Sequence, residues 1–146
     1  MSFQFSLAAV LSFRESLEQR EYLALERIQS EIGRTEAQIL EIGEKLGTMT
    51  QLRETELFRG IRSVHLQQAY EDELALERHL NLLQDRLREL KSRRQQQLKS
   101  YDLARQKRRV LDELRSHQLE IYTREQARRQ QILLDDLFLA RRKRGK

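Results

Sequence analysis

The stretch Phe58-Arg59-Gly60-Ile61-Arg62-Ser63 decides the fold, because it holds the clearest helix-breaking signal in the chain. Gly60 can adopt a left-handed conformation at little steric cost, and Ser63 has a hydroxyl suited to capping a following helix. The cap signal is incomplete, since position 66 is Leu where a capping box has Glu or Gln. We predict a turn at about 58–63 that folds one long helix back on another.

The composition on both sides of this turn is typical of long helices. The 146 residues include no proline, 35% are charged and 6% are aromatic, and Glu, Arg, Gln and Leu are abundant. We predict an all-α fold, a long antiparallel two-helix coiled-coil hairpin with an overhanging C-terminal helix, in one domain spanning 1–146. Helix one is expected at about 5–57, helix two at about 64–141, and a basic C-terminal end at 141–146.

Apolar residues recur at coiled-coil spacing in the first helix. One series contains Phe3, Leu7, Val10 and Leu17, with Arg14 at a seam position. A second series, in steps of three and four, contains Leu25, Ile28, Ile32, Thr35, Ile39, Ile42, Leu46 and Met49. Joining the two series requires successive steps of four through Glu21, which predicts a stutter in the supercoil.

The second helix has a seam of its own. It contains Ala69, Glu73, Leu76, Leu80, Leu83, Leu87 and Leu90, thins across 91–109 to Leu98, Tyr101 and Leu103, and resumes at Leu111, Leu114, Ile121, Ile132 and Leu139. Acidic residues in 15–45 would face basic residues in 75–105, which favours antiparallel pairing. With Gly60 as the midpoint, Phe3 faces about His117, and residues 118–146 overhang with exposed apolar side chains typical of an interaction site.

The residues needed for catalysis are not brought together by any motif. His65, His79 and His117 lack metal-ligand spacing, no glycine loop precedes a Lys-Ser or Lys-Thr pair, and cysteine is absent. We expect no enzyme activity, cofactor, metal or small-molecule substrate. A net charge of +5 permits an acidic partner, but the basic run from Arg93 to Arg109 has one nearby stacking aromatic, Tyr101, so the nucleic-acid signal is weak.

The N-terminal residues are apolar but predict neither a signal peptide nor a membrane span. A basic leading region is missing, and the pattern runs directly into Arg14 and Glu15. No stretch approaches the roughly 18 apolar residues of a transmembrane helix. We expect a cytoplasmic protein.

Both ends of the chain resemble the FliJ family of flagellar type III export proteins. The opening reads Phe3-x-Phe5-x-Leu7-x-x-Val10-Leu11-x-x-x-Arg14-Glu15-x-x-Glu18. The ending has Leu114, then Tyr122-x-Arg124-Glu125-x-x-Arg128-Arg129, Leu134-Asp135-Asp136-Leu137 and a basic cluster. The length, the central turn and the longer second helix are also similar.

The resemblance implies a coiled coil shaped like the central stalk of rotary ATP synthases. Such proteins insert their terminal segments into the hexamer of the export ATPase FliI and promote its assembly. They also contact the cytoplasmic domain of the export gate FlhA and help recycle export chaperones, at the cytoplasmic face of the inner membrane. The implied ATPase-binding residues are Phe3, Phe5, Leu7, Val10, Leu11, Arg14, Arg128, Arg129, Leu137 and Arg141.

The implied gate-binding residues lie nearer the turn and are Gln38, Ile42, Met49 and Leu76. This sequence departs from the family there, because Lys45, Met49 and Asp72 stand where aromatic residues are expected. Two alternatives remain open: the matching stalk protein of a virulence type III secretion system, and a generic coiled-coil adaptor that binds an acidic partner or nucleic acid.

Overall fold

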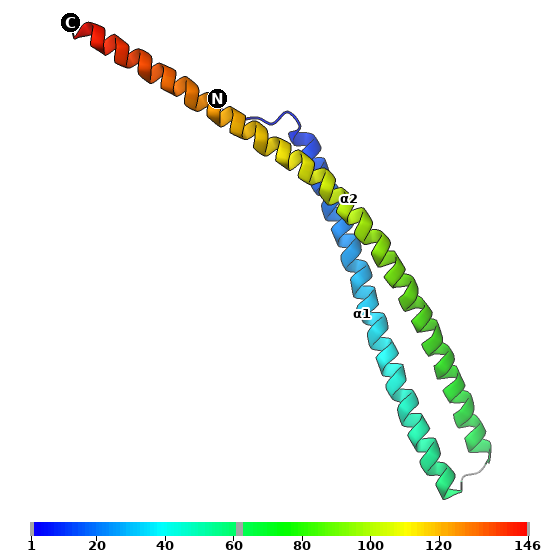
Figure 1. Ribbon diagram of the computed structural model, residues 1–146. Coiled ribbons are helices and arrows are strands. Elements are labelled where there is room, and N and C mark those ends of the chain that lie inside the picture. The colour runs from blue at the N-terminus through cyan, green and yellow to red at the C-terminus, as the bar shows by residue number, and fades with distance from the viewer. Residues whose placement is uncertain (1, 61–62, 146) are drawn as a thin grey trace. The chain divides into compact units, whose positions relative to one another are not determined.

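Two long helices make up the computed structural model, which describes residues 2–60 and 63–145 and all their side chains except those of Ser63 and Val64. Helix α1 spans Ala8–Arg59 and helix α2 spans Ser63–Arg144 (Figure 1). The predicted all-α antiparallel hairpin is confirmed, and the described residues form no strand.

Gly60 ends α1 as the sequence predicts. Its φ of 77° lies in the left-handed region, and its N–H donates to the Leu57 carbonyl oxygen at 3.4 Å. Glycine reaches this conformation without the clash that a Cβ would cause. Ile61 and Arg62 of the expected turn lie outside the described residues, and so does the capping hydroxyl predicted for Ser63.

The helix ends differ from the expected bounds by a few residues. The Ala8 N–H donates to the Phe5 carbonyl at 3.1 Å, so a turn precedes α1, which begins at Ala8. At the other end α2 continues to Arg144, and the Gly145 N–H donates to the Arg141 carbonyl at 3.0 Å. The four cations of this last turn, Arg141 to Arg144, stabilise it through the helix dipole.

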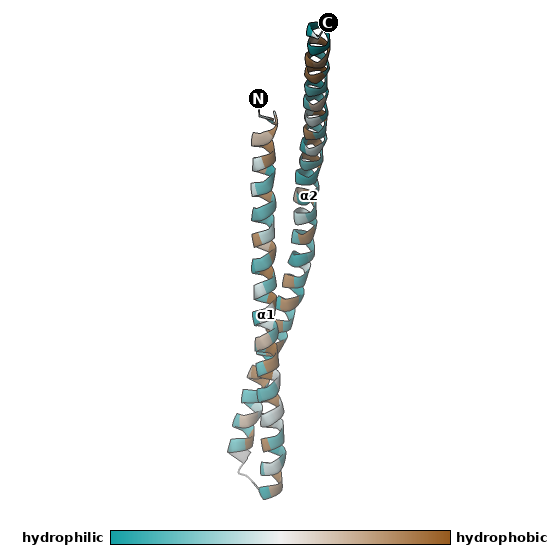
Figure 2. Cartoon of the chain, turned by 90° about the vertical axis from the view of Figure 1, so that its left-hand side faces the viewer, coloured by the Kyte–Doolittle hydropathy of each residue, from teal (hydrophilic) through white to brown (hydrophobic). Residues whose placement is uncertain are grey.

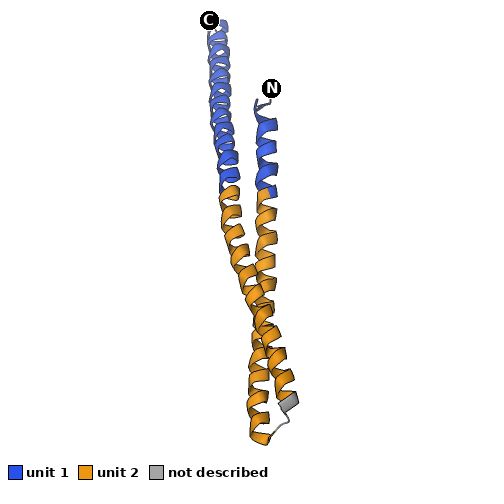
Figure 3. Cartoon of the chain, turned by 90° about the vertical axis from the view of Figure 1, so that its right-hand side faces the viewer, with its two compact units in different colours: residues 1–20, 102–146 blue, residues 21–101 orange. Residues whose placement is uncertain are grey.

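The chain divides into two compact units, and both helices pass through both (Figure 3). Unit 1 contains residues 1–20 and 102–146, and unit 2 contains residues 21–101. In unit 2 the helices run antiparallel from the turn (Figure 1). Arg53 pairs with Glu73 at 2.5 Å near the turn, and Arg86 pairs with Glu31 at 3.3 Å farther along.

The interior of unit 2 follows the predicted seams. Every member of the series Leu25 to Met49 and of the series Ala69 to Leu90 is buried or half-buried. Ile32 and Leu90 are each 1% exposed, which makes them the most completely covered large side chains. Burying such a side chain contributes about 1.5–3 kcal/mol, so these seams hold the hairpin together.

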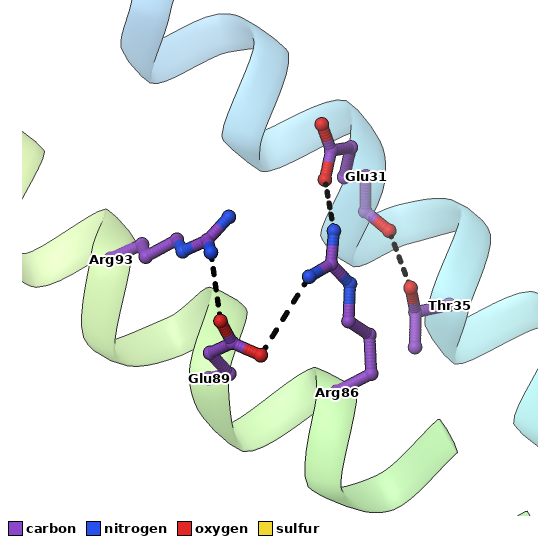
Figure 4. Close-up of polar contacts among 5 residues, drawn as sticks. All are labelled: Glu31, Thr35, Arg86, Glu89 and Arg93. Atoms are coloured by element: carbon purple, nitrogen blue, oxygen red, sulfur yellow. Dashed lines mark hydrogen bonds and ion pairs between the residues drawn. The ribbon is translucent and has the colours of Figure 1, made fainter. Parts of the chain in front are cut away.

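Several polar groups at this seam are paired across and along the helices, whereas one buried carboxylate oxygen of Glu73 has no hydrogen-bond partner. Thr35 is 7% exposed, and its hydroxyl donates to the Glu31 carbonyl at 2.8 Å. The guanidinium of Arg86 reaches the Glu31 carboxylate of α1 and, at 3.7 Å, the Glu89 carboxylate of its own helix (Figure 4). Exposed ion pairs of this kind add little free energy but favour one alignment of the two helices.

The positions that define the predicted stutter, Leu17, Glu21 and Leu25, are all half-buried, but the seam before them differs from the prediction. Leu7 and Val10 are 37% and 42% exposed, whereas Leu11 is 6% exposed. The half-buried positions between Leu11 and Leu25 are Arg14, Leu17, Glu18, Glu21 and Ala24, so the predicted line through Leu17 and a line in steps of three and four through Glu18 are both partly covered. Polar side chains occupy this part of the seam because α2 supplies their hydrogen-bond partners, as described below.

The seam of α2 likewise continues through polar residues instead of thinning. Leu98 and Leu103, expected to be its apolar members, are 46% and 53% exposed. The half-buried positions after Leu90 are Arg94, Gln97, Tyr101, Ala104, Arg108 and Leu111. In unit 2 the Gln97 side-chain amide donates to the Glu21 carbonyl at 3.0 Å and also to the Glu21 carboxylate.

We expect Gly43→Ala and Gly47→Ala each to stabilise the chain by about 1 kcal/mol, because glycine weakens a helix interior by that amount. Both positions lie in α1, and a Cβ built at either meets no atom within 4 Å. Urea unfolding measures the effect. The matched control is Gly60→Ala, which at positive φ should destabilise the chain by roughly 1–2 kcal/mol.

Candidate functional site

All ten residues of the implied ATPase-binding set lie in unit 1, but they do not form one exposed surface. Phe5 and Leu11 are 8% and 6% exposed, so they belong to the interior of the unit. Phe3 is half-buried, with its ring centroid 5.5 Å from that of Tyr122. Leu7 and Val10 remain on the surface. The N-terminal motif therefore divides into residues that hold the segment on α2 and residues open to a partner.

The overhang is shorter than predicted. Phe3 faces Tyr122 instead of His117, and Gln118, Glu125 and Gln126 are half-buried. Every described residue from 127 to 145 is exposed, so the overhang begins at Ala127 and not at Gln118. The prediction took Gly60 as the centre of the helix pairing. The cross-helix pair Glu18–Arg108 is centred on residue 63, so each residue of α1 faces a later residue of α2 than predicted.

The overhang (residues 127–145) presents apolar groups on more than one side. Its exposed apolar residues are Ile132, Leu133, Leu134, Leu137, Phe138 and Leu139, at 46–67% exposure, and they give the brown bands near the C-terminus in Figure 2. Consecutive residues of an α-helix point about 100° apart, so each of these two runs of three covers much of the circumference. A helix that is apolar on several sides is typically buried by its surroundings.

One side of the overhang carries a shallow hollow. It is lined by Leu134, Asp135, Leu137, Phe138 and Arg141. Leu137 and Arg141 belong to the implied ATPase-binding set, and the other three residues were not in it. Steps of three and four link Leu134 to Leu137 and Phe138, Asp135 to Phe138, and both Leu137 and Phe138 to Arg141, which is the signal that groups these residues around one hollow.

The cations of unit 1 differ in their local pairing. Arg128 and Arg129 contact the Glu125 carboxylate at 2.8 Å and 3.5 Å. The hydrogen bond from Arg128 lowers the pKa of Glu125 below its ordinary value, and the same bond raises the pKa of Arg128. These two arginines are thus partly neutralised within their own helix, whereas Arg141 lines the hollow.

A partly buried polar cluster in unit 1 was not predicted from the sequence. The Arg108 guanidinium donates to both Glu18 carboxylate oxygens, at 2.6 Å and 3.3 Å, and to Asp112 at 2.7 Å. The side chains of Arg108 and Glu18 are 24% and 18% exposed. The hydrogen bonds that Arg108 donates to Glu18 and Asp112 raise the pKa of Arg108, so it stays charged. Steps of three and four along each helix would have placed Glu18 and Arg108 in the seam if polar residues had been allowed at seam positions.

Replacing Arg108 with Leu should destabilise the chain by about 1–3 kcal/mol, because the Glu18 carboxylate loses its partner in a partly buried position. The double variant Glu18→Leu/Arg108→Leu should recover most of that loss, since apolar residues fill the seam without an unpaired charge. Urea unfolding of both single variants and the double variant measures the interaction free energy between Glu18 and Arg108. Strictly additive effects would contradict a direct interaction.

The implied gate-binding residues lie in unit 2 and are mostly covered. Ile42 is 7% exposed, Met49 and Leu76 are half-buried in the seam, and Gln38 is exposed. Among the described residues, the exposed apolar surface near the turn includes Leu52, Leu57 and Phe58, at 56%, 54% and 96% exposure. These three fall outside the seam series, which is the sequence signal that places them on the surface.

The described residues contain neither a candidate metal site nor a helix able to span a membrane. Among residues 2–60 and 63–145, no group of three or more His, Asp or Glu side chains is placed to hold a metal ion. Within that same part of the chain, neither helix contains an apolar run long enough to cross a bilayer.

Comparison with known proteins gave no neighbour: no family model, no curated protein and no solved structure matches the chain. Function is therefore inferred from the surfaces of the chain itself.

Proposed function

We propose that this chain is a non-catalytic stalk of a bacterial flagellar type III export apparatus. It binds the hexameric export ATPase (FliI-like) through unit 1 and promotes assembly of the ring. The observation that carries the proposal is the exposed overhang, with apolar residues on several sides and a basic end. The resemblance of both chain ends to the FliJ family supports it.

The chemistry of the overhang favours a partner that surrounds the helix. A flat partner would cover one side and leave other leucines in water, whereas a ring opening would cover several sides. Leu7 and Val10 of the N-terminal segment add exposed apolar surface to the same unit. Arg141 and the cations after it suit acidic groups on the ATPase.

The proposed mechanism is mechanical. A paired-helix body has no six-fold symmetry, so inside a six-fold ring it must contact the six subunits unequally. Unequal contacts give the subunits different nucleotide affinities, which is an allosteric coupling between the stalk site and the nucleotide sites. The chain then needs no catalytic residue of its own.

Unit 2 carries the proposed contact with the export gate (FlhA-like). Gln38 is open to a partner, and Leu52, Leu57 and Phe58 provide exposed apolar surface near the turn. Ile42 is 7% exposed, so it offers little direct contact to a partner. Escort of export chaperones and a position at the cytoplasmic face of the inner membrane complete the proposed role.

The test is the hydrolysis rate and ring assembly of a flagellar export ATPase with and without this chain. We expect both to rise, and Leu137→Glu/Phe138→Glu to weaken binding by roughly tenfold or more, since each buried apolar side chain contributes about 1.5–3 kcal/mol. The matched control Leu40→Glu changes an equally exposed leucine of unit 2 and should have no effect.

An unchanged hydrolysis rate and unchanged assembly would refute the proposal. Activation of a virulence-system ATPase but not of the flagellar one would assign the chain to the virulence secretion system. Tight binding to DNA or RNA that weakens steeply with salt would favour a nucleic-acid role instead.

A further inference from the structure

A second line of apolar side chains runs along α2 in unit 1, apart from the seam that faces α1. This outer stripe consists of Leu103, Val110, Leu114, Ile121, Ile132 and Leu139, all 36–63% exposed. Their separations are seven, four, seven, eleven and seven residues, all built from steps of three and four. That spacing is typical of a coiled-coil seam, and no helix in the described part of the chain covers it.

The outer stripe is nearly symmetric about Ile121. Leu103 and Leu139 lie equally far from it along the chain, on opposite sides, and so do Val110 and Ile132. If two copies of this helix packed antiparallel with Ile121 against Ile121, Leu103 would meet Leu139 and Val110 would meet Ile132. An apolar residue would thus meet an apolar residue in each of these three pairings, whereas Leu114 would lie opposite Arg128.

The charges beside the stripe are complementary about the same centre. Lys107 would lie opposite Asp135 and beside Asp136, and Glu113 would lie opposite Arg129 and beside Arg128. Asp102, at the start of the unit, would lie near Arg142 at the far end. Two-fold symmetry forms each of these pairs twice. Arg128 also bonds Glu125 of its own helix, but a guanidinium has five donors, which is enough for both carboxylates.

Other alignments of the two helices place like charges together. If one helix is shifted by seven residues in one direction, Lys107 lies opposite Arg128. If it is shifted by seven in the other direction, Lys107 lies opposite Arg142, and Glu113 lies opposite Asp136. A parallel pair in register would set Lys107 against Lys107. Charges beside a coiled-coil seam select partner, orientation and register in this way.

We propose that two copies of this chain form a symmetric dimer in which the outer stripes pack antiparallel about Ile121. The paired segment, residues 103–139, is about 54 Å long at 1.5 Å per residue. The interface is isologous, since each copy contributes the same surface. It covers Ile132 and Leu139 of the overhang, so ATPase binding would compete with it. The dimer itself is independent of the export role and is measured on the isolated chain.

Cysteine cross-linking tests the geometry directly, because the natural sequence contains no cysteine. Ile121→Cys should form a disulfide-linked dimer on mild oxidation. Leu103→Cys alone should not, but should cross-link when mixed with Leu139→Cys. Leu133→Cys is the matched control, since Leu133 is 61% exposed in the overhang but lies off the stripe. Cross-linking of Leu103→Cys with itself would indicate parallel pairing and overturn the proposal.

Sedimentation equilibrium tests the energetics on the full chain. We expect a mass twice that of the 17.6 kDa chain at high concentration. Lys107→Asp should weaken the dimer by roughly tenfold or more through repulsion of Asp136, and Lys107→Asp/Asp136→Lys should restore it. A monomer at every concentration, or a double variant no better than the single one, would overturn the proposal, and circular dichroism checks that each variant keeps its helices.

Discussion

Truncation after Gln126 is expected to abolish activation of the export ATPase while leaving the hairpin folded. The removed segment is the overhang, whose described residues are all exposed. It takes away the hollow around Leu137 and the terminal cations, which are the proposed contacts with the ring. It removes none of the buried residues and none of the cross-helix pairs, so the free energy of unfolding of unit 2 should change little.

The truncated chain is compared with the full chain in the hydrolysis and ring-assembly assays, and its helix content is measured by circular dichroism. The control is a chain that ends after Arg141, which keeps the apolar part of the overhang and should retain most of the activation. Full activation by residues 1–126 would place the ATPase contact elsewhere. Loss of helicity throughout the hairpin would show that the overhang is structural.

Leu90→Ala should produce the largest loss of stability of any single substitution proposed for this chain. Leu90 is 1% exposed at the seam of unit 2, so truncation removes buried methyl groups and leaves a cavity. Such changes typically cost about 2–5 kcal/mol. Ile32→Ala, at the equally covered position of α1, should cost a similar amount.

Leu82→Ala is the matched control, because Leu82 lies on the same helix and is 67% exposed. Its effect should remain within about 0.5 kcal/mol. Urea unfolding followed by circular dichroism measures all three variants. Equal effects of Leu90→Ala and Leu82→Ala would mean that the seam does not hold the hairpin together.

The part of the fold near the turn is predictable because there the seam is almost wholly apolar. Periodicity alone identifies the seam residues from Leu25 to Met49 and from Ala69 to Leu90. Gly60 has a positive φ, a backbone conformation that favours glycine. The N-terminal register is harder, since Glu18 and Glu21 stand in the seam. A carboxylate is acceptable there only if the other helix supplies a donor, and Arg108 and Gln97 do so from about ninety and seventy-six residues away in sequence.

The candidate site depends on the same long-range register. Which of Phe5, Leu7, Val10 and Leu11 faces a partner follows from how the N-terminal segment packs on α2, and local sequence does not specify that. The start of the overhang also shifts with the centre of pairing. The overhang itself is predictable, because α2 is longer than α1 and its last apolar residues have no counterpart in the chain.

The most direct test of the export role is the stoichiometry of the complex with the ATPase ring, measured by native mass spectrometry alongside the hydrolysis rate. A single asymmetric stalk inside a ring predicts one chain per ATPase hexamer and a raised rate. Six chains per hexamer, or no complex at all, would contradict it.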